Sequence, residues 1–320
     1  MSKRSLIHIE ILRTFALLCV IYFHVTGMLS TKICVPGMST ILYSSSLLVG
    51  IAVPLFMFIS GYLYKPVESS QILSFIKKKA LRLWFPYIVF SIFIMITSGF
   101  FSFSSLLSGG FYHLWFLTAL FWCFIFSIKI NYASVFSFFM LPITLVCSII
   151  SIPDFLGLQD FIQWFYFFVL GAIVKSHANA IVFLRKYLLW VPLVLFYVGV
   201  NIFVPFHYRE PSIIHALAES AIILSIWTLL EPINLKISLE GKVSRLFLAI
   251  GSCSMGIYIL HYWLLIYILS STSFSIFHIV LGLQNYTFVT VMIIVFLTFI
   301  CSLFITNFAR RYKLGRLLLG

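Results

Sequence analysis

Charged side chains are scarce in this sequence of 320 residues, and acidic ones are the scarcest. Only 9% of the residues are charged, with 8 Asp and Glu against 21 Lys and Arg. A soluble domain carries roughly a quarter charged residues, so the composition excludes a sizeable soluble domain. The 62% hydrophobic content predicts instead an all-α, polytopic integral membrane protein.

The sequence also has few cysteines, and none of them has the spacing of a metal site. The six are scattered, mostly inside apolar segments, and we interpret them as small packing residues. No zinc pattern and no Ser–His–Asp order is visible, so no metal is expected. The cysteines lie at Cys19, Cys34, Cys123, Cys147, Cys253 and Cys301.

Apolar runs of membrane-spanning length fill the chain and predict about ten transmembrane helices. The second is expected to be broken near Pro54, and a basic stretch at residues 65–82 is expected to lie on the membrane surface as an amphipathic helix. The predicted spans cover residues 7–29, 40–64, 83–103, 113–128, 133–152, 161–174, 187–206, 213–230, 246–269 and 287–308.

The basic residues follow the positive-inside rule rather than a nucleic-acid-binding pattern. With ten spans, 18 of the 20 Lys and Arg outside the first span fall on the side of the two termini. Only Lys32 and Arg209 fall on the other side. This asymmetry predicts that both termini are cytoplasmic and that no nucleic acid is bound.

Ionisable residues interrupt the first span on one helix face. Glu10 and Arg13 are three residues apart and share that face. His24 follows Arg13 by eleven residues, about three helical turns or roughly 16 Å along the axis. Charges inside a bilayer usually face a partner or a polar cavity. The alternative is that Glu10 and Arg13 are interfacial residues and His24 only packs.

Further ionisable residues lie at a similar predicted depth in three other spans. His113 opens the fourth span, Glu219 lies in the eighth, and Ser254, Tyr258 and His261 form one polar stripe in the ninth. Taken singly, each of these residues is explained by a structural role in which its side chain is hydrogen-bonded. Together with the histidine of the first span they predict a reaction site or a proton path.

A basic cluster is predicted at the cytoplasmic end of the third span. Lys77, Lys78, Lys79 and Arg82 lead into it, with Arg13 at comparable depth. Such a cluster could bind the phosphates of a soluble cofactor. Alternatively, these charges only fix topology and contact anionic lipids, and we favour that interpretation for the lysine run alone. Arg82 is the better cofactor candidate because it directly abuts the span.

Five motifs follow one another along the chain: Glu10, Arg13 and His24; residues 54–63 (PLFMFISGYL); residues 82–86 (RLWFP); residues 113–117 (HLWFL); and residues 254–261 (SMGIYILH). With these motifs the chain resembles the acyltransferase 3 family of bacterial integral-membrane acyltransferases. Each motif is short, but together they are specific and cover most of the chain. The family's usual acidic residue before the arginine is Asp, where this sequence has Glu.

The resemblance implies one transmembrane acyltransferase domain over residues 1–320, of the subgroup without an added hydrolase-like domain. It implies acetyl-CoA as acyl donor and a hydroxyl of a glycan or lipid-linked saccharide as acceptor, at a bacterial cytoplasmic membrane. A catalytic role is expected for His24, His113 and His261 and, from its predicted depth rather than from the family motifs, for Glu219. Residues expected to bind the donor are Glu10, Arg13, Ser60, Lys79, Arg82, Trp115 and Tyr258.

Two roles are open for His24, and two rival functions are open for the protein. His24 either takes a proton from the acceptor hydroxyl or briefly carries the acyl group, while His113, Tyr258 or Trp115 donates to the oxyanion. One rival is an exporter of a polysaccharide or small acid that uses the histidines as a proton relay. The other is a membrane interaction protein, in which replacing His24 has no effect. Contacts with membrane lipids are expected, and a homo-oligomer is possible.

Overall fold

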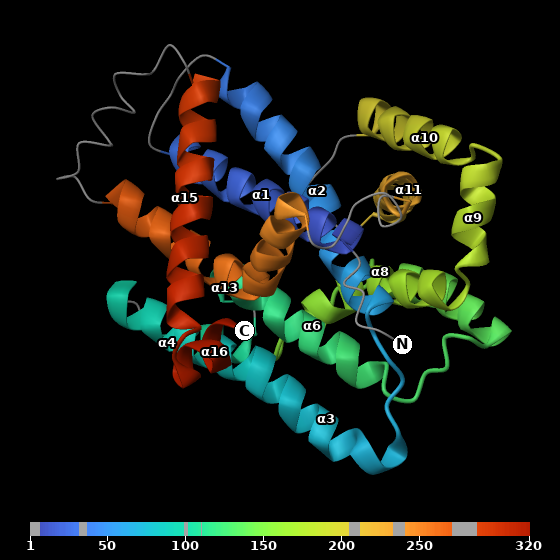
Figure 1. Cartoon of the computed structure of the whole chain (residues 1–320), viewed down its shortest axis with the longest axis horizontal. Coiled ribbons are helices and arrows are strands. Elements are labelled where there is room, and N and C mark those ends of the chain that lie inside the picture. Colours follow the sequence, from blue (N-terminus) through green and yellow to red (C-terminus); the bar gives the residue numbers. More distant parts are fainter. Residues whose placement is uncertain are drawn as a thin grey trace. The chain divides into compact units, whose positions relative to one another are not determined.

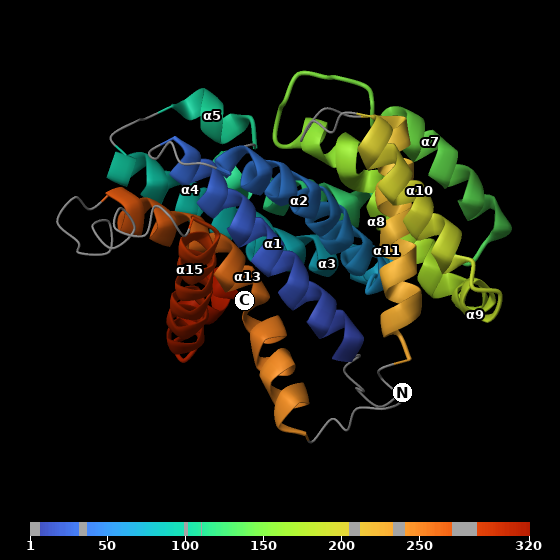
Figure 2. The ribbon, with the colours of Figure 1, turned by 90° about the horizontal axis from the view of Figure 1, so that it is seen from above.

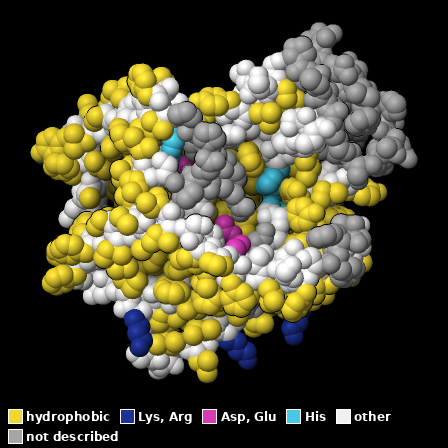
Figure 3. Space-filling model, turned by 180° about the vertical axis from the view of Figure 1, so that it is seen from behind, with side chains coloured by type: hydrophobic (Ala, Val, Ile, Leu, Met, Phe, Trp, Pro, Cys, Tyr) yellow, Lys and Arg dark blue, Asp and Glu magenta, His cyan; other side chains and the backbone are white. Residues whose placement is uncertain are grey.

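The computed structural model describes residues 7–31, 37–98, 102–109, 111–204, 212–232, 241–270 and 287–320. Within these ranges the chain is all-helical: 84% of the residues are in helices and there are no strands. This confirms the predicted fold class. Hydrophobic side chains cover much of the face seen in Figure 3, as expected of helices whose outer surfaces contact lipid.

Seven helical stretches among the described residues are long and apolar enough to cross a membrane. An eighth is added if the stretches 158–176 and 179–186, bent by 87°, form one span. Two shorter apolar helices, at 135–147 and 190–203, coincide with two further predicted spans. The count of about ten spans and the cytoplasmic termini therefore stay predictions. The seven stretches are 7–30, 38–62, 69–97, 103–126, 213–230, 242–267 and 288–309.

Two local expectations were wrong. The second helix, α2 (Met38–Tyr62), is not broken at Pro54 but contains it. The basic stretch is helical, but it is not a separate element. Its helix α3 (Ile72–Lys79) runs through a π-helical turn, η2 (Ala80–Trp84), directly into α4 (Phe85–Ser98). The prediction gave Pro54 too much weight. In a membrane, neighbouring helices and local adjustments of the helix satisfy the backbone groups that a proline frees, so the helix continues.

The chain forms two compact units, and their boundary falls at Pro54 within α2. Unit 1 consists of Met1–Val53 and Ile237–Gly320, and unit 2 of Pro54–Lys236. Proline removes one intrahelical hydrogen bond, which makes it a natural position for such a boundary. The two units are described separately below.

Unit 1 is a bundle in which three long helices contact one another: α1 packs on α13, α13 on α15, and α1 on α15 (Figures 1 and 2). The first part of α2 is tied to α1 by two hydroxyl pairs, Tyr22 with Ser44 at 3.0 Å and Thr26 with Ser45 at 2.8 Å. Besides the first part of α2, the helices of unit 1 are α1 (Ile7–Ser30), α13 (Lys242–Ser270), α15 (Thr287–Ala309) and α16 (Lys313–Leu319).

Unit 2 holds the rest of α2 and the shorter helices. Within it α6 packs on α8, and α8 packs on α7. Helix α10 packs on α11 (Figures 1 and 2). Besides α3, η2 and α4, its elements are η1 (Ser69–Gln71), α5 (Phe103–Leu107), η3 (Tyr112–Leu114), α6 (Trp115–Phe126), η4 (Val135–Phe139), α7 (Met140–Cys147), α8 (Leu158–Ser176), α9 (Asn179–Lys186), α10 (Trp190–Phe203) and α11 (Ile213–Leu230).

Two glycines let α2 and α8 cross in backbone contact within unit 2. A Cβ at Gly61 would lie 1.9 Å from the carbonyl oxygen of Phe168, and a Cβ at Gly171 would lie 2.0 Å from that of Phe58. Small residues commonly permit such close helix approach in membranes. Gly61 belongs to the second family motif, so this part of the motif has a packing explanation.

Polar ties join the C-terminal ends of three helices in unit 2. The Tyr64 hydroxyl donates to the Ser127 carbonyl at 2.7 Å, and the Ser127 and Tyr132 hydroxyls lie 2.9 Å apart. Lys175 Nζ donates to the Tyr64 carbonyl at 2.5 Å. Burial raises the pKa of Tyr132, so its hydroxyl stays protonated. A cation and hydroxyl donors at helix C-termini satisfy carbonyls that have no intrahelical partner.

Candidate functional site

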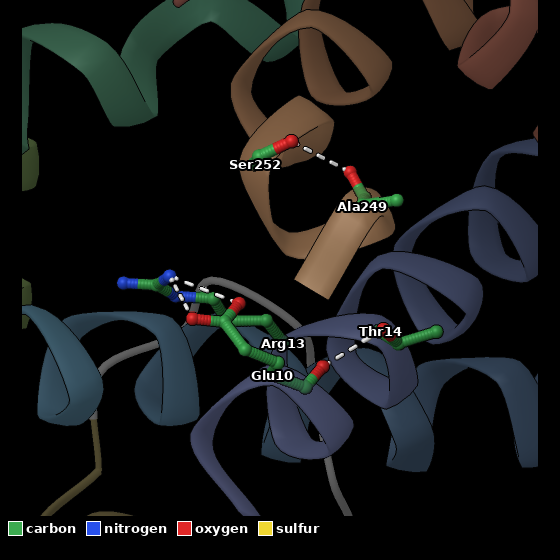
Figure 4. A network of polar contacts seen from close by, with 5 residues as sticks. All are labelled: Glu10, Arg13, Thr14, Ala249 and Ser252. Atoms are coloured by element: carbon green, nitrogen blue, oxygen red, sulfur yellow. Dashed lines mark hydrogen bonds and ion pairs between the residues drawn. The ribbon is translucent and has the colours of Figure 1, made fainter. Parts of the chain in front are cut away.

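The predicted acid–base pair of the first helix is formed. In Figure 4 the Arg13 guanidinium points at the Glu10 carboxylate, and its Nη1 lies 3.0 and 3.1 Å from the two oxygens. The Thr14 hydroxyl donates to the Glu10 carbonyl at 2.8 Å. The Arg13 and Glu10 side chains are 24% and 15% exposed. The pair is therefore partly withdrawn from solvent, and its formal charge is zero.

The Glu10 carboxylate rests against the backbone of α13 at a glycine. A Cβ built at Gly251 would lie 1.6 Å from Glu10 Oε2 and 2.6 Å from its Cδ. Only a residue without a side chain therefore leaves room for the carboxylate in this position. The absence of a side chain at Gly251 thus allows the Glu10–Arg13 pair of α1 to pack directly on α13.

The next residue of α13, Ser252, is bound by an arginine that the sequence analysis counted only as a topology signal. Nη1 of Arg310, just after α15, donates to Ser252 Oγ at 2.9 Å and to Cys253 Sγ at 3.3 Å. Ser252, drawn in Figure 4, also donates to the Ala249 carbonyl at 2.8 Å. The end of α15 is thus tied to the helix turn that supports Glu10.

The two predicted histidines of unit 1 meet. The ring centroids of His24 on α1 and His261 on α13 lie 5.3 Å apart, with 40° between the ring planes. Tyr262 packs edge-on against His24 at 5.0 Å. His24 is partly exposed and His261 is fully buried. Of the two imidazoles, His24 is therefore the one that a substrate can reach.

The backbone fixes the proton of His261. Its Nδ1 lies 3.2 Å from the carbonyl oxygen of Ile257, and a carbonyl oxygen only accepts, so Nδ1 carries the hydrogen in the neutral ring. The lone pair is then on Nε2. Tyr258, one turn back, has its ring centroid 5.8 Å from that of His261. The predicted stripe of Tyr258 and His261 on one helix face is therefore present.

The fourth family motif forms a buried corner in unit 2. His113 and Trp115 are buried after a left-handed residue, Tyr112, with φ 47°. Trp115 stacks on Trp164 of α8 at 5.8 Å between ring centroids. The Trp164 indole nitrogen is buried and has no hydrogen-bond partner among the described residues. A buried donor of this kind in a native fold usually has a ligand or water as its partner.

In the basic segment, the two residues predicted to bind the acyl donor, Lys79 and Arg82, have different surroundings. Lys79 Nζ lies 3.2 Å from the ring centroid of Phe124 and 5.3 Å from that of Phe75. Arg82 lies in the π-helical turn η2, and such turns are frequent at functional sites. The ammonium of Lys79 is thus held by aromatic faces, while Arg82 is set on an irregular part of the helix.

Two predicted residues of unit 2 are left, Ser60 and Glu219. The Ser60 hydroxyl donates to the Phe56 carbonyl of its own helix at 2.8 Å. Glu219 of α11 is buried, and no described residue donates a hydrogen bond to it or forms an ion pair with it. The neighbouring Ser220 donates to the Tyr166 hydroxyl at 3.1 Å.

The predicted residues are therefore divided between the two units. Unit 1 brings together Glu10 with Arg13, and His24 with Tyr258 and His261; the other six predicted residues lie in unit 2. Across the described ranges, no three His, Cys, Asp or Glu side chains are placed to hold a metal ion.

Sequence reasoning missed five residues that the structure adds: Tyr262, Gly251, Ser252, Arg310 and Trp164. Adjacency to His261 was the only available signal for Tyr262. The others act through contacts between helices that are far apart in the sequence, and no local pattern encodes these contacts.

Comparison with known proteins gives one match. Residues 6–307 fit the model of the acyltransferase 3 family, described as an acyltransferase domain. No curated protein and no solved structure matches the chain. The family model covers nearly the whole chain and agrees with its several apolar helices. The chain is a multi-pass membrane acyltransferase and belongs to the acyltransferase 3 family.

Proposed function

We propose that the protein moves an acetyl group from cytoplasmic acetyl-CoA to a hydroxyl of a cell-surface glycan or of its lipid-linked precursor, in the bacterial cytoplasmic membrane. The observation that carries the proposal is the arrangement of unit 1. Arg13, paired with Glu10, and His24 lie along α1, and the ring of His24 lies 5.3 Å from that of His261 on α13.

The charged end suits the donor. Arg13 uses Nη1 for Glu10, and its remaining N–H groups have no partner among the described residues, so they are available to a phosphate. The loop charges favour the cytoplasmic side for this end, where acetyl-CoA is made. His24 lies roughly 16 Å further along the axis. This is a separation that the extended pantetheine arm of CoA can cross.

The histidine pair suits the chemistry. His24 accepts the proton of the acceptor hydroxyl as its oxygen attacks the thioester carbonyl, a C–O bond forms and the C–S bond breaks. The thiolate that leaves takes the proton from His24. The buried neutral ring of His261 lies beside His24 and stabilises the imidazolium between these two transfers. An imidazole is suited to both steps because its pKa lies near neutrality.

The residues of unit 2 enter the proposal from the family motifs. Arg82 is a further contact of the acyl donor, acetyl-CoA. Trp115 and His113 donate hydrogen bonds to the oxyanion. Glu219, Ser60 and Lys79 have weaker support, because the first lacks a described partner and the other two are engaged by their own helix or by aromatic rings.

A labelling assay tests the proposed function. Purified protein in proteoliposomes is incubated with [14C]acetyl-CoA and washed membranes from cells that lack the protein, which supply the acceptor. We expect label in the saccharide fraction and release of free CoA only when the protein is present. Saccharide movement without acetyl-CoA consumption would instead identify an exporter and overturn the proposal.

A further inference from the structure

Arg310 is a partly buried cation without a described counter-charge. Its Nη1 is fixed by Ser252 and Cys253 at 2.9 and 3.3 Å. Its Nε is buried, and no described residue accepts a hydrogen bond from it or forms an ion pair with it. Guanidinium has five N–H donors in a planar fork. The guanidinium of Arg310 is therefore fixed at Nη1, while its Nε–H has no acceptor among the described residues.

Arg310 and the Arg13–Glu10 pair contact adjacent residues of α13. The Glu10 carboxylate rests on Gly251, and Arg310 is bound to Ser252, the next residue of α13. Because Glu10 already neutralises Arg13, Arg310 adds to this part of unit 1 a cation that no described carboxylate neutralises. An anion that only Arg13 attracted would also be repelled by Glu10.

We propose that Arg310, positioned by Ser252, is a second phosphate contact of the acyl-donor site, at the same end of unit 1 as Arg13. The inference rests on the proposed function. A CoA thioester carries a diphosphate and a separate ribose phosphate, so its recognition calls for more than one cation. The planar fork of Arg310 matches two oxygens of one phosphate. A lipid headgroup phosphate has the same chemistry and is the alternative occupant.

Binding to detergent-purified, delipidated protein tests the inference with three probes: acetyl-CoA, acetyl-dephospho-CoA and S-acetyl-pantetheine. We expect Arg310→Gln to weaken acetyl-CoA binding about 10- to 100-fold, the loss of one charge-assisted contact. Binding of S-acetyl-pantetheine, which has no phosphate to contact, should not change. In turnover, KM for acetyl-CoA should rise with little change in kcat.

Arg311→Gln is the matched control. It removes the same charge from the adjacent residue, whose guanidinium lies 5.8 Å from the ring centroid of Phe308. We expect its acetyl-CoA affinity to match the wild type within about twofold. Ser252→Ala keeps the Arg310 charge but removes its anchor, and should give a smaller loss than Arg310→Gln. Because Ser252 is exposed, this variant remains informative if Arg310→Gln does not fold.

The outcomes separate the inference from the function beneath it. If the wild type binds no acetyl-CoA, the proposed function fails. If the wild type binds and both Arg310→Gln and Ser252→Ala bind equally well, only the inference fails. It also fails if Arg310→Gln loses affinity for vesicles of anionic phospholipid but not for acetyl-CoA, because the occupant is then a lipid.

Discussion

Replacing Gly251 by alanine should separate the Arg13–Glu10 pair without disrupting the fold. The new Cβ would lie 1.6 Å from Glu10 Oε2 and 2.6 Å from Cδ, so the carboxylate has to swing away by roughly 2 Å to reach ordinary van der Waals separation. The hydrogen bonds of 3.0 and 3.1 Å to Arg13 are lost. The colliding atoms are the end of a flexible side chain, so little packing energy is involved.

The cost should appear in donor binding. Once the contact with Glu10 is lost, the Arg13 side chain regains its rotamer freedom. The ligand then has to order this side chain, at a cost of about 1–2 kcal/mol. We expect acetyl-CoA affinity to fall roughly tenfold, while the unfolding temperature stays near that of the wild type. Isothermal titration calorimetry and thermal unfolding of the purified variant measure both quantities.

A double variant gives this prediction its control. Glu10→Asp shortens the side chain by one methylene and makes room for the alanine, so Glu10→Asp with Gly251→Ala should bind better than Gly251→Ala alone. Gly27→Ala on α1 meets nothing within 4 Å and should be neutral. An unchanged affinity in folded Gly251→Ala would refute the role given to the glycine.

Three further substitutions test unit 2 by thermal unfolding. Gly171→Ala places a Cβ 2.0 Å from the Phe58 carbonyl, and because backbone cannot move aside, we expect a loss of about 1–3 kcal/mol or more. Lys79→Met removes the ammonium held 3.2 Å from the Phe124 ring centroid and should cost about 1–2 kcal/mol. Trp164→Phe keeps the stacked ring and deletes an N–H without a described partner, so its stability should change by less than about 1 kcal/mol.

Matched variants separate these effects from generic ones. Gly199→Ala, with nothing within 4 Å of its Cβ, should not destabilise the protein. Lys77→Met removes an exposed lysine of the same run and should leave the unfolding temperature unchanged. If Lys79→Met instead leaves stability intact and weakens acetyl-CoA binding, Lys79 is a donor contact, as the family resemblance implies.

The features that local periodicity encodes could be predicted. Helical spacing placed Glu10 with Arg13 and Tyr258 with His261 on shared faces, and hydropathy placed the apolar helices. The break at Pro54 was wrong because a sequence pattern does not show how the surrounding helices support a proline. The extended helix from the basic stretch into α4 was missed because charge suggested a change of direction where the backbone makes only a π turn.

Pairings between helices could not be predicted. The contact of His24 with His261 joins residues more than two hundred positions apart, and depth alone could not pair them. The seat of Glu10 on Gly251 depends on a missing side chain, which has no periodic signature. Arg310 was absorbed into the terminal basic run, and its unsatisfied guanidinium appears only once Ser252 is seen to hold it.

The central claim is that His24 transfers the proton during acetyl transfer. The most direct measurement is kcat for acetyl transfer by His24→Ala together with its dissociation constant for acetyl-CoA, with His177→Ala as a control histidine at the end of α8. We predict that His24→Ala lowers kcat about 10²- to 10⁴-fold while acetyl-CoA binding and folding are retained. Wild-type turnover in His24→Ala, with activity abolished in His113→Ala or His261→Ala, would contradict the claim and move the catalytic role to that histidine.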